Sequence, residues 1–285
     1  MRAMSTAALV ACLLLGSASQ ALADDKSSAS AAASLTAPEA KTKYYFRLGG
    51  LHLAPIVNSD NVVLSNVSPF AQLAVQNGPI EGSGGSINAL TVPAGIIGYV
   101  LPYWDGRLSV ETVLGLPLSL DLKVTGTMAS ESLAPYALGN VPTGVPALGE
   151  SLGTAKAIPP VVTAVYRFLP EKSFHPYAGA GLALMFVYDA KIENPILTSV
   201  SEPTLEVGNG YGVVAQAGVE ARIYDRYFAT LDFKTILGLS VEAVVHDIYV
   251  ETPELPLFEM AEVGDASVEI GIVPIIITAG VGADF

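Results

Sequence analysis

The sequence has almost no cysteine and little charge, and beyond its N-terminal region it has no long apolar run. Its one cysteine is Cys12, so no disulfide framework is open to this chain of 285 residues. Charged residues make up 14% of it, against about 25% in an ordinary soluble domain. Because no run of about 18 apolar residues follows residue 23, the sequence predicts no transmembrane helix. Since 51% of the residues are nevertheless hydrophobic, the composition favours strands with one apolar face.

Basic residues are also scarce, and motifs for catalysis or metal binding are missing. The chain has 14 Lys and Arg against 27 Asp and Glu, a net charge of -13 that argues against a nucleic-acid partner. The patterns H-E-x-x-H and G-x-S-x-G do not occur. His52, His175 and His246 lie on separate segments, and we expect them to be interfacial or solvated. The sequence therefore predicts no enzyme, no catalytic residue, no metal site and no cofactor.

The N-terminal region has the pattern of an export signal. Met1 and Arg2 precede an apolar stretch over residues 7–15, and Ala21-Leu22-Ala23 forms a cleavage site. Leu9 to Cys12 also resemble a lipoprotein cleavage motif, although the apolar run continues past the cysteine. We expect a signal peptide at residues 1–23, a flexible periplasmic leader at 24–42 that is rich in Ser and Ala, and a folded domain at 43–285.

Residues 43–285 contain segments in which apolar residues alternate with others, each long enough to cross a bilayer as a tilted strand, for which about 9–11 residues suffice. They are residues 44–53, 89–101, 107–118, 157–168, 175–188, 211–223, 227–241 (or on to 250) and 268–285. Three connections are short, and four are long, near residues 54–88, 119–156, 189–210 and 242–267. This predicts an all-β fold, an eight-stranded antiparallel transmembrane β-barrel with short periplasmic turns and long extracellular loops, in the outer membrane of a Gram-negative cell.

The last strand ends on an aromatic residue, Phe285. A barrel must pair its last strand with its first, because an open edge in lipid leaves backbone groups without hydrogen bonds. We expect Phe285 to close the barrel and to act as its assembly signal toward the barrel-assembly machinery.

Five stretches resemble the OmpW family of small outer-membrane barrels. They are F-R-L-G-G-L-H-L-A-P (46–55), I-P-P-V-V-T-A-V-Y-R-F (158–168), F-H-P-Y-A-G-A-G-L (174–182), V-A-Q-A-G-V-E-A-R (214–222) and A-G-V-G-A-D-F (279–285). The resemblance implies eight strands around a narrow apolar lumen that passes small hydrophobic compounds, with sideways release into the membrane as one exit. The leader and the first two outer loops are longer here, and the chain ends on G-A-D-F where G-Y-R-F is common in the family.

Alternation assigns the inward face of each strand, since a slip of one residue would place charges in lipid at about 2–4 kcal/mol for each basic residue. We expect the inward charges near the periplasmic ends to pair as a polar plug: Arg47, Arg107, Glu111, Arg167, Glu220, Arg222, Asp232 and Lys234. Above them we expect an apolar lumen: Leu51, Val92, Ala94, Ile96, Val161, Ala183, Met185, Val187, Ile236, Ile270, Ile272 and Ile276.

Two interpretations of this apolar layer remain open. An eight-stranded barrel is just wide enough for its own side chains to fill it, so the layer could be core. Small residues such as Ala94, Gly179 and Gly181 leave room, and prolines at 93, 159, 160 and 274 remove backbone donors where a side opening could form. Together with the resemblance they favour a passive conduit for small hydrophobic molecules.

The alternative is a non-conducting structural or surface-recognition barrel, such as an adhesin or receptor, whose long loops bind partners. The partners expected under the conduit hypothesis are outer-membrane lipid and lipopolysaccharide, the barrel-assembly machinery and small hydrophobic ligands, with the protein as a monomer.

Overall fold

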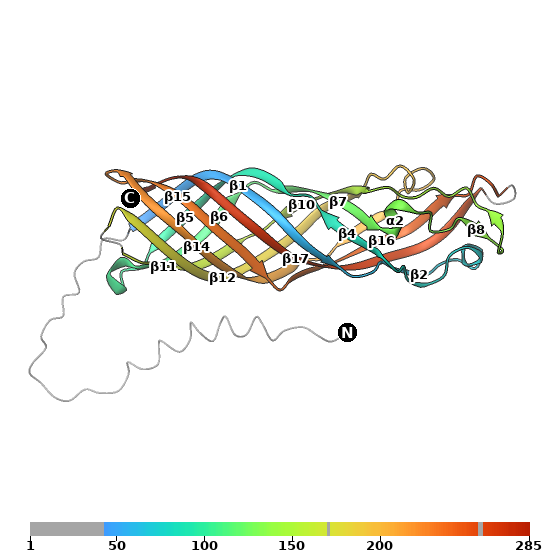
Figure 1. Cartoon of the computed structure of the whole chain (residues 1–285), viewed down its shortest axis with the longest axis horizontal. Helices are drawn as coiled ribbons and strands as arrows, with labels where there is room; N and C mark the ends of the chain where they lie inside the picture. Colours follow the sequence, from blue (N-terminus) through green and yellow to red (C-terminus); the bar gives the residue numbers. More distant parts are fainter. Residues whose placement is uncertain (1–42, 170–171, 256–258) are drawn as a thin grey trace, which may run out of the picture. The chain divides into compact units, whose positions relative to one another are not determined.

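Antiparallel strands wind obliquely around a barrel in the computed structural model, which describes residues 43–169, 172–255 and 259–285 (Figure 1). The expected signal peptide and leader lie outside the described residues and stay predictions. A closed ring of paired strands forms the barrel wall: β1 (Lys43–Ser59), β5 (Leu90–Val100), β6 (Leu108–Gly115), β11 (Val161–Arg167), β12 (Phe174–Ile192), β14 (Gly210–Tyr224), β15 (Tyr227–Leu237) and β17 (Met260–Asp284). The number of strands that cross lipid stays a prediction.

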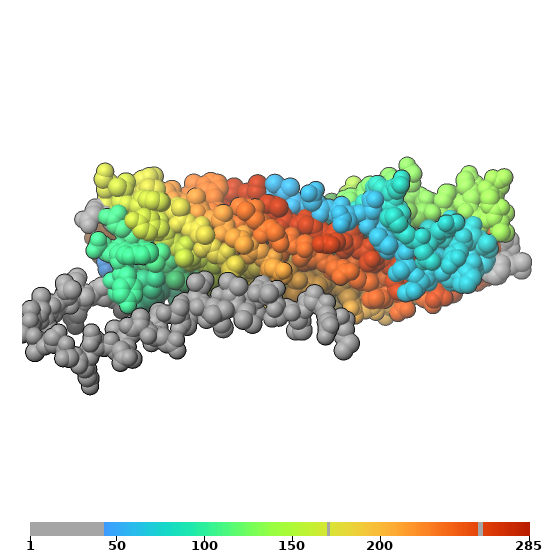
Figure 2. All heavy atoms as spheres, turned by 90° about the horizontal axis from the view of Figure 1, so that it is seen from below, coloured from blue at the N-terminus to red at the C-terminus, as the bar shows by residue number. Residues whose placement is uncertain are grey.

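The pairing of β1 with β17 closes this ring. The ladder runs from Tyr45 opposite Asp284 to Ser59 opposite Ile270, and it satisfies the backbone groups of both strands. Figure 2 shows the red atoms of β17 running obliquely beside orange strands, with blue atoms of β1 alongside. The backbone N–H of Phe285 donates to the carbonyl of Tyr44 at 2.7 Å, so the last residue is held at the start of the first strand.

The long connections predicted at 54–88, 119–156, 189–210 and 242–267 contain regular structure, most of which extends the wall. They hold β2 (Val63–Ser65), β3 (Gly78–Pro79), β4 (Ser83–Ile87), β7 (Leu118–Gly126), β8 (Tyr136–Ala137), β9 (Val141–Pro142), β10 (Ser151–Ile158), β13 (Thr204–Val207) and β16 (Leu239–Glu251). Strand β7 lies between β4 and β10, and β16 lies between β13 and β17.

The polarity of the outward face explains why the sequence did not predict most of these outer strands. In β7, Leu118 and Leu120 are buried, whereas Ser119 and Asp121 are exposed. Outside the membrane the outward face meets water, so an alternating strand there lacks the apolar outward residues that mark a lipid-crossing strand.

The same change of polarity along β17 marks the edge of the lipid-facing band. Val273, Ile275 and Val281 are exposed on the outer face, whereas Glu262 and Glu269 are exposed farther from the chain terminus. We call the end of the barrel that holds Phe285 the terminal end and the opposite end the outer end. The short turns, the start of β1 and the end of β17 all lie at the terminal end. This is the arrangement of barrels whose short turns face the periplasm.

Within residues 43–169, 172–255 and 259–285, helical structure is confined to short pieces: the 3-10 turns η1 (Ala71–Leu73) and η2 (Trp104–Gly106) and the helix α2 (Thr127–Ser130). Within the described residues, none of these is long or apolar enough to span a membrane.

Candidate functional site: a two-chamber apolar lumen above a polar cluster

A network of buried charges crosses the barrel near its terminal end. Arg47 of β1 is 2% exposed, and its Nη2 lies 2.8 Å from Glu111 Oε1 of β6 and 2.5 Å from Glu220 Oε1 of β14. Arg167 of β11 donates from Nε to Glu220 Oε2 at 3.0 Å. These four side chains come from four strands, so the network ties opposite parts of the wall together.

Tyrosine and amide groups complete the network. Tyr45 donates its hydroxyl to a Glu111 oxygen at 2.5 Å, and Tyr177 donates to Asp232 Oδ1 at 2.7 Å. Gln216 donates to the same Asp232 oxygen at 2.7 Å. The Lys234 ammonium forms an ion pair with Asp232 Oδ2. Buried carboxylates are thus each met by at least one donor, which burial requires.

The charges of this polar cluster balance. Its three cations are Arg47, Arg167 and Lys234, and its three carboxylates are Glu111, Glu220 and Asp232. An equal number of opposite charges in hydrogen-bonding contact lowers the large desolvation cost that each would carry alone. The cluster therefore fills the terminal end of the lumen with a dense polar layer.

Two residues predicted for the plug lie outside this cluster, which corrects that part of the prediction. Arg107 is half-buried in the turn before β6, at the C-cap of η2. Arg222 is exposed and binds Asp284 Oδ2 at 2.9 Å and the carbonyl of Asp225 at 2.6 Å. Alternation predicts a face only within a regular strand. Arg107 precedes β6, and the ladder between β14 and β15 shifts register just after Arg222.

His175 is a further correction, because it is buried and not interfacial. Its Nδ1 lies 4.0 Å from Glu220 Oε2, and its Nε2 has no partner among the described residues. It shares the inward face of β12 with Tyr177, two residues on.

The two tyrosines were missed by sequence reasoning, although a signal for them exists. Tyr45 lies opposite Gly98, and Tyr177 lies opposite Gly218, across neighbouring strands. A Cβ at Gly98 would lie 1.9 Å from Tyr45 Cζ, and one at Gly218 would lie 2.4 Å from Tyr177 Cζ. Each ring therefore covers its glycine. In the sequence, an inward glycine paired across a ladder with an aromatic residue predicts such a packed ring.

An apolar cavity of about 190 Å³, which we call the inner chamber, lies against the polar cluster. Ten of the twelve predicted lumen residues line it: Leu51, Val92, Ala94, Ile96, Val161, Ala183, Met185, Ile236, Ile272 and Ile276. For scale, a dry apolar cavity of about 150 Å³ binds benzene. Side chains narrow the lumen here without filling it.

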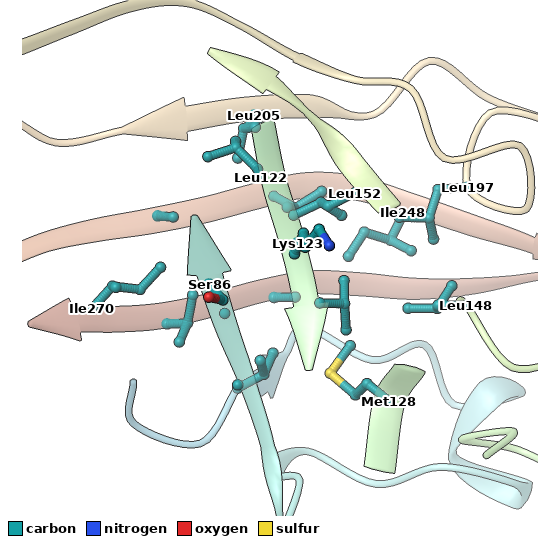
Figure 3. A pocket seen from close by; sticks show the side chains of 18 of the residues that line it. Ser86, Leu122, Lys123, Met128, Leu148, Leu152, Leu197, Leu205, Ile248 and Ile270 are labelled. Atoms are coloured by element: carbon teal, nitrogen blue, oxygen red, sulfur yellow. The ribbon is translucent and has the colours of Figure 1, made fainter. Parts of the chain in front are cut away.

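A second apolar cavity of about 140 Å³, the outer chamber, lies among the outer strands. The remaining predicted lumen residues, Val187 and Ile270, line this one. Figure 3 shows leucine and isoleucine side chains, among them Leu122, Leu152 and Ile248, gathered around it from several strands. Ile87, Leu120 and Met185 line both chambers, and we call these three residues the partition.

The wall of the inner chamber is interrupted on one side. The ladder between β6 and β11 ends at Thr112 opposite Val162, and the ladder between β7 and β10 begins at Leu118 opposite Ala157. Between these two points the described ladders contain no pair that joins the two sides.

Prolines and apolar side chains border this side gap. Pro159 and Pro160 have no N–H with which to extend a ladder. Gly115, Leu116 and Ile158 line the inner chamber together with these prolines, and Leu116 is 70% exposed. Residues that line the inner chamber on this side are thus also exposed on the outer face of the wall.

The protein has a closed antiparallel wall, a lipid-facing band and an apolar lumen. These three features together define a β-barrel protein of the outer membrane. The chain belongs to the OmpW family, whose model matches residues 105–285. The protein resides in the outer membrane.

Known proteins agree with this assignment. The uncharacterized outer-membrane protein y4mB of Sinorhizobium fredii (strain NBRC 101917 / NGR234) is 25% identical over 195 residues, 68% of this chain and 76% of that protein. The crystal structure of the outer membrane protein OprG from Pseudomonas aeruginosa matches with a TM-score of 0.62 at 14% identity, covering 86% of this chain and 96% of OprG. The solid-state NMR structure of AlkL in lipid bilayers matches with a TM-score of 0.50 at 14% identity, covering 92% of this chain and 96% of AlkL. At these identities the two structures support the fold.

Proposed function

We propose that the barrel is a passive conduit for small hydrophobic molecules. The observation that carries the proposal is the inner chamber, which is apolar, is bounded by the polar cluster and reaches the wall at the side gap. A solute moves from the outer chamber past the partition into the inner chamber. The polar cluster opposes its further passage, because an apolar solute cannot replace the hydrogen bonds of buried ions.

The side gap is the proposed exit into the membrane. An apolar solute gains nothing by moving from the chamber into the cluster, whereas lipid beyond Leu116 is as apolar as the chamber itself. No energy source or chemical step is needed, because transfer of an apolar solute from water into hydrocarbon is itself favourable.

A charge placed in the inner chamber tests the conduit. We expect Ile96→Asp and Met185→Glu to abolish most of the protein-dependent uptake of naphthalene into vesicles with a lipopolysaccharide outer leaflet, followed by the probe's fluorescence. Ile96→Val and Met185→Leu are the matched controls, because they keep the site apolar. Gel mobility of the unheated barrel reports folding of each variant. Equal uptake by wild type, charged variants and protein-free vesicles would overturn the proposal.

A blocked side gap tests the exit. Cys12 lies in the expected signal peptide and the described residues contain no cysteine, so Leu116→Cys supplies a unique thiol in the mature chain for a bulky maleimide. We expect labelling of Leu116→Cys to slow naphthalene uptake several-fold, whereas labelling of Leu231→Cys, on the outer face of β15, leaves uptake unchanged. An equal effect of both labels would contradict exit through the gap.

We further propose that the terminal strand is the contact with the barrel-assembly machinery and that the protein works as a monomer. Phe285 supports the first point, since it is 66% exposed beside the closing ladder.

A further inference from the structure

The inner chamber has two polar side chains in an otherwise apolar lining. They are Lys234 of β15 and Thr278 of β17, and every other lining residue is aliphatic, glycine or proline. Because Lys234 pairs with Ile276, two residues before Thr278, the two polar residues are diagonal neighbours on adjacent strands. The inner chamber thus has a single polar point, next to Asp232 of the polar cluster.

Both groups keep hydrogen-bonding capacity that the protein does not use. An ammonium has three donors, and within the described residues Lys234 Nζ has one hydrogen-bond partner, Asp232 Oδ2. The Thr278 hydroxyl likewise has no hydrogen-bond partner among the described residues, although Thr278 is buried. Unused donors in an apolar enclosure are costly, so a ligand oxygen that meets them is favoured.

The charge balance of the cluster decides which kind of oxygen fits. Three cations already face three carboxylates, and the Lys234 charge is offset by Asp232. A carboxylate ligand would add a fourth negative charge beside Asp232, in surroundings where like charges repel strongly. A neutral acceptor, such as the oxygen of a ketone, aldehyde or alcohol, takes a hydrogen bond from the ammonium without changing the balance.

We propose that the inner chamber selects small apolar molecules that carry one neutral oxygen acceptor, held against Lys234 and Thr278 with the apolar body toward Ile276 and Ile236. The inference rests on the proposed conduit and specifies its substrate class. It makes Lys234 and Thr278 the specificity-determining residues of the inner chamber.

The test is binding of two molecules of matched shape to the full chain in nanodiscs, followed by fluorine NMR. The probes are para-fluoroacetophenone, which has the acceptor, and para-fluoroethylbenzene, which lacks it. For each protein the ratio of the two affinities is measured, so that partition of the probes into lipid cancels between proteins. We expect wild type to exceed the Lys234→Met variant in this ratio by about tenfold or more, the effect of a hydrogen bond to a charged donor.

A second variant keeps the test decisive if Lys234→Met fails to fold with Asp232 unpaired. Thr278→Val has nearly the same shape and no hydroxyl, and we expect it to lower the ratio several-fold. Ile276→Val is the control, because it weakens both probes alike and leaves the ratio unchanged. An unchanged ratio in both polar variants would overturn the inference, as would tighter binding of para-fluorobenzoate than of the ketone. Equal binding of both probes by wild type would also overturn it while leaving the conduit intact, whereas binding of neither probe would count against both proposals.

Discussion

Removal of Arg47 should destabilise the barrel more than removal of any surface arginine. Arg47 bridges Glu111 and Glu220 at 2.8 and 2.5 Å and is 2% exposed. In Arg47→Met, three carboxylates face two cations, and two of the carboxylates lose their shared donor. Breaking a buried pair by removing one partner costs about 3–5 kcal/mol.

Arg222→Met is the matched control. Its ion pair with Asp284 is 2.9 Å long but exposed, and such pairs contribute about 1 kcal/mol or less. We therefore expect the free energy of unfolding in lipid vesicles, measured by urea titration of tryptophan fluorescence, to fall at least three times as far in Arg47→Met as in Arg222→Met.

A double variant separates the loss of charge balance from the loss of packing. Arg47→Met with Glu111→Leu leaves two cations and two carboxylates, and replacing a buried pair by apolar residues is often neutral or stabilising. We expect the double variant to be more stable than Arg47→Met alone. A smaller loss for Arg47→Met than for Arg222→Met, or a double variant less stable than the single one, would refute the balanced-cluster reasoning.

Two further predictions concern packing and pH. Gly98→Ala should lower the free energy of unfolding by roughly 1–3 kcal/mol, because the added Cβ would clash with the Tyr45 ring. Gly50→Ala is the control and should leave the free energy of unfolding unchanged, since no atom lies within 4 Å of the added Cβ. Urea titration of both variants measures the difference. Asp265 accepts hydrogen bonds from the Asn66 side chain, the Asp247 N–H and His246. These bonds, that from Asn66 most of all, hold the pKa of the Asp265 carboxyl below its usual range. The stability that the hydrogen bond between Asn66, next to β2, and the ionised Asp265 contributes is therefore fully present above the ordinary carboxyl pKa. It is lost as the pH falls through the depressed pKa of Asp265. Proteolysis near residues 60–66 should increase over that acid range in wild type, whereas Asp265→Asn should show no such dependence.

Much of the wall could be predicted from the sequence, because a strand in lipid obeys a simple rule. Outward residues must be apolar, so alternation alone assigned Val162, Ala164 and Phe233 to the exposed side, and the structure places them there. The outer strands followed a different rule, since β7 exposes Ser119 and Asp121 to water, and the sequence predicted a loop in their place.

Sequence by itself determined the class of fold, the membrane and the inward face of each regular strand, since all three follow from the local spacing of apolar residues. Only the tertiary structure decided which inward groups meet. Arg47 and Glu220 are 173 residues apart and touch because the registers of several ladders bring them to one height, whereas Arg107 and Arg222 fall where the strands end or shift. The two chambers, the side gap and the polar point at Lys234 likewise depend on how distant strands are aligned, which no local pattern records.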